Sequence, residues 1–226
     1  MSISRVLAGV CLLSVFGSGC ASTPKAAPQK DHIAAFNAER VSEAPYKPTV
    51  SDPAAAAGVS ALANTVSVLY SGVCAKVEKE SQLSDGRRDW IGFTNEVAAV
   101  QQGGKNYADA KSEVWGRLTD DAQKTRILNY ERAVKPADFD SRRADLTETS
   151  EKLLDAGAQS LVLADALKKD EKQTGIQAAL NAKALNTDIK ALKNQISDAT
   201  KGVALLMEIN EQDKAAQAYM RDYPVE

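Results

Sequence analysis

Apolar side chains recur every three or four residues from about residue 52 onward, which is the spacing of one face of an α-helix. The first stripe of this kind consists of Val59, Leu62, Val66, Leu69, Val73 and Val77. Asp52 can cap this helix, and Pro53 suits its first turn. The pattern predicts a long amphipathic helix that ends at Asp85-Gly86.

Shorter stripes between residues 86 and 135 predict further helices. One stripe runs from Trp90 to Val100 and ends at Gly103-Gly104. A second, broken stripe begins at Tyr107, and a further helix begins after Thr119-Asp120 and stops before a proline. We expect these helices to pack against the C-terminal part of the chain and complete one core.

The last third of the chain has the most regular pattern. A helix is expected from Asp140 or Ser141, followed by a bend at residues 168–175 and a second helix to about residue 223. The second helix carries a heptad seam of Ala178, Ala182, Leu185, Ile189, Leu192, Ile196, Ala199, Val203, Leu206 and Asn210. This predicts an antiparallel, coiled-coil-like hairpin over residues 140–223. The alternative is one continuous helix that dimerises in trans.

The amino-acid composition also favours a helical structure for the chain. Its 226 residues include 37 alanines and only 5% aromatic residues, and alanine has the highest intrinsic helix propensity. A helix from Gly175 to Tyr223 would be about 70 Å long, which exceeds the width of a compact domain of this size. We therefore predict an all-α fold, with a single elongated helical bundle over residues 52–224.

The N-terminus has the features of a secretion signal. Arg5 precedes an uncharged run from Val6 to Phe16, which is too short to span a membrane as a helix. The sequence Gly17-Ser18-Gly19-Cys20 that follows resembles the lipobox of bacterial lipoproteins, although Gly17 replaces the usual leucine. The resemblance implies a signal peptide over residues 1–19 and lipidation of Cys20. The alternative is an ordinary signal that is cleaved after Ala21 and leaves no lipid.

By the same resemblance, Ala21 after the cysteine implies an outer-membrane location, facing the periplasm or the cell surface. Five of the seven prolines fall between residues 24 and 53. Proline disfavours regular structure, so residues 20–51 are expected to form a tether between the lipid and the bundle. Within it, residues 31–41 have helical spacing and either dock or fray.

Candidate chemistry is sparse. His32 is the one histidine, and it lies in the predicted tether, so we expect no catalytic residues, no metal site and no cofactor. Cys74 lies in an apolar stripe and is expected to be a buried thiol. A net charge of −2 and the lack of a continuous basic face give no indication of nucleic-acid binding.

These features favour a non-enzymatic envelope lipoprotein, held in the membrane through Cys20, whose helical body binds a protein or the cell wall. It would serve as a scaffold, as an accessory part of an envelope-spanning machine, or as a surface adhesin. The predicted interaction surface comprises Arg142, Arg143, Leu185, Ile189, Leu192 and Ile196. Homo-oligomerisation through the seam is a further option, and the alternative function is a periplasmic enzyme acting on envelope polymers.

Overall fold

The computed structural model describes residues 29–168 and 175–221, and within these ranges the chain is all-α, as the sequence predicts. The six helices are α1 (Gln29–Glu39), α2 (Pro53–Gln102), α3 (Tyr107–Arg117), α4 (Asp121–Ala133), α5 (Phe139–Lys168) and α6 (Gly175–Arg221). A short 3-10 helix, Pro136–Asp138, connects α4 to α5.

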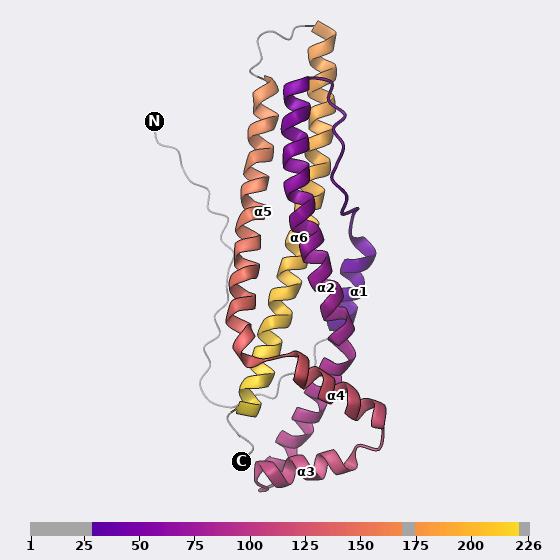
Figure 1. Cartoon of the computed structure of the whole chain (residues 1–226), viewed down its shortest axis with the longest axis vertical. Helices are drawn as coiled ribbons and strands as arrows, with labels where there is room; N and C mark the ends of the chain where they lie inside the picture. The colour runs from indigo at the N-terminus through magenta and orange to yellow at the C-terminus, as the bar shows by residue number, and fades with distance from the viewer. Residues whose placement is uncertain (1–28, 169–174, 222–226) are drawn as a thin grey trace, which may run out of the picture.

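Three long helices give the molecule its elongated shape. α2, α5 and α6 lie side by side, and α3 and α4 gather at one end, as Figure 1 shows. With 50 residues, α2 is about 75 Å long. The most extensive contacts are those of α6 with α5 and with α2. The predicted hairpin is thus confirmed within one chain, and the alternative of one continuous C-terminal helix is wrong.

The prediction that the first long helix ends at Asp85-Gly86 is wrong, because α2 continues through this dipeptide to Gln102. Gly86 is buried against α4. A Cβ atom at this position would lie 2.9 Å from the carbonyl oxygen of Arg126 and 3.2 Å from Cβ of Tyr130. The glycine therefore provides room for a close approach of two helices.

Most other helix ends agree with the sequence pattern. The side chain of Asp52 accepts a hydrogen bond from the Ala55 amide at 2.8 Å, and Asp120 caps α4 in the same way through Ala122. α2 ends at the predicted glycine pair, where Gly104 has a φ of +96° that favours glycine.

Much of the predicted tether packs against the bundle: α1 docks, which is one of the two outcomes expected for residues 31–41, whereas the prediction of a spacer is wrong for residues 42–51. Ile33 and Phe36 of α1 are buried in the core. After α1, the non-helical residues 40–52 run along α2 and α6, and Asp188 of α6 holds them in place. Asp188 accepts hydrogen bonds from the amides of Thr49 and Val50, each at 3.0 Å. The prolines of this segment prevent regular helix hydrogen bonds, as the sequence indicates. The amides of Thr49 and Val50 instead donate to a side chain of α6.

Further contacts fix the same segment. Asp198 accepts from the Val41 amide at 3.1 Å, and Gln195 Nε2 donates to the carbonyl oxygens of Ser42 and Ala44. On the other side, the hydroxyl of Ser67 in α2 donates to the Glu43 carbonyl. Residues 40–52 thus form a strap that links α2 and α6 without adding a helix.

α2 is the one helix of the described residues that is long and apolar enough to cross a membrane by length and composition. In its most apolar window, 44% of the residues are buried inside the protein. Val59, Val66 and Val73 all face the core. Packing against α5, α6 and the strap therefore accounts for much of its apolar character.

Predictions for the N-terminal region and the hairpin bend lie outside the described residues. They concern the signal peptide, lipidation at Cys20, residues 21–28 of the tether, and the bend within residues 169–174.

Candidate functional site

The apolar part of the predicted interaction surface is buried. Leu185, Ile189 and Leu192 lie in one core cluster with residues of α2, and Ile196 is half-buried beside it. The prediction that the seam offers these side chains to a partner is wrong. The seam faces both α5 and α2, and this third helix covers the surface that a two-helix hairpin would have left open.

Five of the exposed large apolar side chains lie toward the far half of the hairpin, while Val68 of α2 is exposed elsewhere to 73%. On α5 these are Leu154, Leu161 and Val162, with exposures of 70%, 54% and 70%. On α6 they are Ile176 and Leu180, with exposures of 81% and 55%. A signal for these positions is present in the sequence, because Leu154 and Leu161 are seven residues apart and Ile176 and Leu180 are four apart.

The two predicted arginines point to different surroundings. Arg143 is exposed and lies 3.4 Å from Glu211 on α6. Arg142 is partly buried, with Nη1 3.9 Å from Glu80 Oε1 and 3.9 Å from Asp213 Oδ2. Of the two arginines assigned to the interaction surface, Arg143 is thus exposed, whereas Arg142 faces an internal group of carboxylates.

Arg142 borders a buried charge cluster, defined here as Glu80, Arg87 and Asp213. Arg87 is 1% exposed, and its Nε donates to Asp213 Oδ1 at 2.7 Å. Its Nη2 donates to Asp213 Oδ2 at 3.2 Å and also to Glu80. The hydroxyl of Tyr130 in α4 donates to the same aspartate. The cluster thus ties α2, α4 and α6 together inside the molecule.

Burial and charge act together on the ionisable groups here. Burial lowers the pKa of Arg87, but the charge and hydrogen bonds of Asp213 outweigh that effect, so the net pKa is raised. Burial also raises the pKa of the Tyr130 hydroxyl, and the negative charge of Asp213 raises it further. Arg87 therefore stays charged and Tyr130 stays neutral at physiological pH. This suits a structural role in which they hold the helices together through non-covalent contacts.

The charge cluster was missed by the sequence analysis, although a signal existed. Val73, Val77, Glu80 and Arg87 continue one helical stripe of α2 at steps of four, three and seven. In α6, Asp213 likewise follows Asn210 by three residues along the seam. Ionisable residues at positions where the pattern demands apolar ones indicate buried charges that must be paired.

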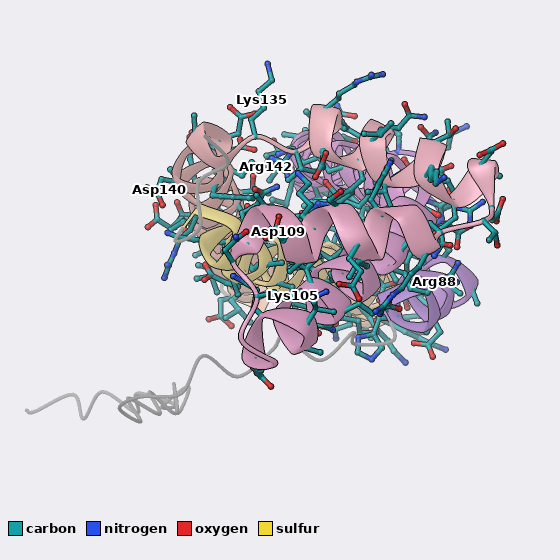
Figure 2. The ribbon with its side chains drawn as sticks, turned by 90° about the horizontal axis from the view of Figure 1, so that it is seen from below. Arg88, Lys105, Asp109, Lys135, Asp140 and Arg142 are labelled. Carbon is teal, nitrogen blue, oxygen red and sulfur yellow. The ribbon has the colours of Figure 1, made fainter. Side chains whose placement is uncertain are left out.

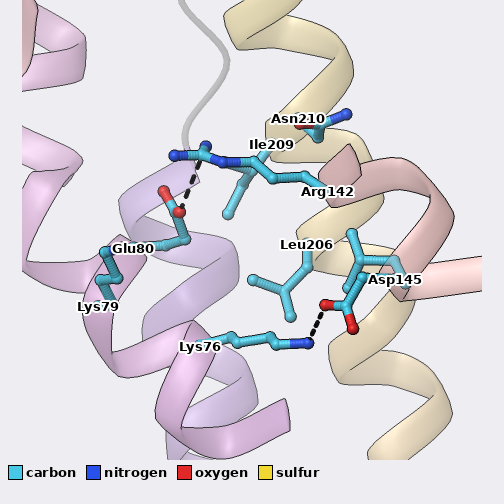
Figure 3. Close-up of a pocket in the computed structure, with 9 residues that line it drawn as sticks. Lys76, Lys79, Glu80, Arg142, Asp145, Leu206, Ile209 and Asn210 are labelled. Atoms are coloured by element: carbon cyan, nitrogen blue, oxygen red, sulfur yellow. Dashed lines mark hydrogen bonds and ion pairs between the residues drawn. The ribbon is translucent and has the colours of Figure 1, made fainter. Parts of the chain in front are cut away.

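Next to the cluster lies a cavity of about 180 Å³ between α2, α5 and α6. Figure 3 shows its main lining residues. Arg142 and Lys76 extend across it from α5 and α2 toward Glu80 and Asp145, with Leu206 of α6 between them. The cavity therefore combines a charged rim with an apolar floor.

Other candidate residues show no comparable grouping. Among the described residues, no three or more His, Cys, Asp or Glu side chains are placed to hold a metal ion. His32 is exposed and lies 3.7 Å from Glu208. Cys74 is buried, as predicted, and burial raises the pKa of its thiol. At the α3 end, Figure 2 shows cations such as Arg88 and Lys105 interspersed with carboxylates.

Comparison of the chain with protein-family models, with curated proteins and with solved structures gives no significant match.

Proposed function

We propose that this protein is a non-enzymatic, lipid-anchored protein of the bacterial envelope whose helical body binds another protein. The observation that carries the proposal is the group of exposed apolar side chains on the far half of the α5–α6 hairpin: Leu154, Leu161, Val162, Ile176 and Leu180. We name this group the hairpin patch. Several large apolar side chains left exposed toward one end of a helical hairpin favour a protein contact there. Its repeats of four and seven suit a helical partner.

The position of α1 would place the lipid anchor and the hairpin patch at different parts of the bundle. Gln29 follows Cys20 by nine positions, and a fully extended chain of that length spans at most about 32 Å. The lipid would therefore hold the start of α1 within about 32 Å of the membrane. His32 of α1 lies beside Glu208, and Ile176 lies about 48 Å farther along α6. An anchor at α1 thus leaves the patch free to reach a partner.

Catalysis is not part of the proposal. Arg87 is neutralised by carboxylates within the charge cluster and is buried, so it offers no reactive group to an envelope polymer. These charges cross-link helices, and we assign them that role.

The anchor is tested by labelling growing bacteria with radioactive palmitate. The wild-type chain and the Cys74→Ala variant should carry label, whereas Cys20→Ala should carry none. Cys74→Ala is the matched control because it removes a cysteine that is buried in the core. Equal label in Cys20→Ala and wild type, or no label in any of the three, would show that the chain is not anchored in this way.

The contact is tested with a photoreactive amino acid placed at Leu161 or at Ile176 in intact cells. Glu148, an exposed polar position on α5, serves as the control. We expect one discrete cross-linked species from each patch position and none from position 148. A product of twice the chain mass would identify a second copy as the partner. The same products from all three positions, or none from the patch, would contradict the proposal.

A further inference from the structure

The cavity beside the charge cluster has the geometry of a small-molecule site. Its floor consists of Leu146, Leu206 and Ile209. Figure 3 shows the Lys76–Asp145 ion pair on one side of Leu206 and the Arg142–Glu80 pair on the other. A ligand would therefore meet hydrocarbon below and charged groups at both edges.

The cations of this rim have unused hydrogen-bonding capacity. Both carboxylate oxygens nearest to Arg142 are 3.9 Å away, which is beyond hydrogen-bond distance. Within the described part of the chain, Arg142 makes no hydrogen bond, and Lys79 makes no ion pair. A guanidinium group has five N–H donors in a planar fork that matches a carboxylate.

The charge balance favours an anion. The lining residues include three cations, Lys76, Lys79 and Arg142, and two carboxylates, Glu80 and Asp145, so one positive charge is in excess. The adjacent Arg87 and Asp213 balance each other. A single negative charge would make the site neutral.

A buried acceptor also lacks a partner. Asn210 Nδ2 donates to the Phe139 carbonyl at 3.1 Å, whereas its Oδ1 is buried and, in the described part of the chain, has no hydrogen-bond partner. Asn210 also lines the cavity, so its wall carries a polar group beside the apolar floor.

We propose that this cavity binds a small monocarboxylate with an apolar body, of about the size of benzoate. The carboxylate would take the free donors of Arg142, and the hydrocarbon would lie on Leu206 and Ile209. The size follows from the volume of about 180 Å³, because a cavity of about 150 Å³ is large enough to hold benzene. This site is separate from the anchor and the hairpin patch, so it is independent of the proposed function.

The test is a protein-detected NMR titration of the full chain with benzoate, followed through the methyl groups of Leu146, Leu206 and Ile209. Methyl groups of Leu185 and Ile189, in another core cluster, serve as an internal control. We expect saturable shifts for the cavity methyls only. Acetate, which lacks the apolar body, and benzylammonium, which reverses the charge, should bind at least tenfold more weakly.

Variants assign the binding to its residues. Arg142→Gln should weaken benzoate binding about tenfold, whereas Arg143→Gln, the neighbouring exposed arginine, should leave it unchanged. Leu206→Phe should abolish the shifts by filling the cavity, and Lys79→Gln should weaken binding severalfold without disturbing the core. Circular dichroism establishes that each variant is folded. Equal affinity in Arg142→Gln and wild type, equal affinity for benzylammonium, or no saturation at millimolar benzoate would overturn the proposal.

Discussion

At the scale of single residues, the charge cluster is the feature on which stability depends most sharply. Arg87 and Asp213 are 1% and 0% exposed, and they hold each other through two hydrogen bonds. A buried ion pair of this kind adds little to folding stability compared with apolar residues of the same size. Loss of one partner is costly, however, because the other charge stays buried without compensation.

We therefore predict that Asp213→Ala lowers the free energy of unfolding by about 3 to 5 kcal/mol, measured by urea denaturation. Asp140→Ala is the control, because Asp140 also pairs with a cation, Lys214 at 2.9 Å, but is exposed. This second change should have a much smaller effect, because exposed ion pairs contribute little to stability. Equal losses in the two variants would mean that Arg87 finds other partners.

At the scale of elements, two glycines of α2 affect the stability of the bundle in different ways. Gly86 faces α4 at a distance that leaves no room for a side chain, whereas Gly72 in the same helix has no atom within 4 Å of an added Cβ. The two glycines therefore have opposite roles. One permits helix packing, and the other only weakens its helix.

This contrast gives a paired prediction for thermal or urea unfolding. Gly86→Ala should destabilise the protein by about 1 to 3 kcal/mol, because the new methyl group pushes against the Arg126 carbonyl. Gly72→Ala should stabilise it by about 0.5 to 1 kcal/mol through improved helix propensity. A stabilising effect at both positions would show that α4 can shift to accept the methyl group.

At the scale of the whole molecule, buried tyrosines couple stability to alkaline pH. Tyr70 lies in the central core cluster and Tyr130 in the cluster near α3 and α4, and burial raises the pKa of both hydroxyls above the ordinary value of 10. Below pH 10 both residues are protonated in the folded and unfolded chain. Above pH 10 only the unfolded chain releases these protons, so stability is lost as the pH rises.

The free energy of unfolding should therefore decrease above pH 10, with about 1.4 kcal/mol per pH unit from each tyrosine. Tyr130→Phe should reduce this slope by about that amount while leaving the contribution of Tyr70. Urea unfolding between pH 9 and 11 measures the difference. Identical slopes in the variant and the wild-type protein would show that Tyr130 titrates normally in the folded state.

The all-α class, the C-terminal hairpin and several helix ends could be predicted from the amino-acid sequence. These features are local, since apolar spacing, the caps at Asp52 and Asp120, and the glycine at position 104 act within a few residues of the chain. The candidate sites were harder to predict from the sequence. Periodicity marks Arg87 and Asp213 as anomalous, but it does not say that they meet, because they are 126 residues apart.

Three features could not be predicted from the chain: α2 passes through Gly86, Leu185 and Leu192 are covered, and residues 40–52 dock as a strap. Each depends on a distant partner. α4 explains the glycine, α2 covers the seam of the hairpin, and Asp188 supplies the acceptor that the strap lacks. A pattern along the chain shows which faces need a partner, whereas the partner itself is chosen by long-range packing.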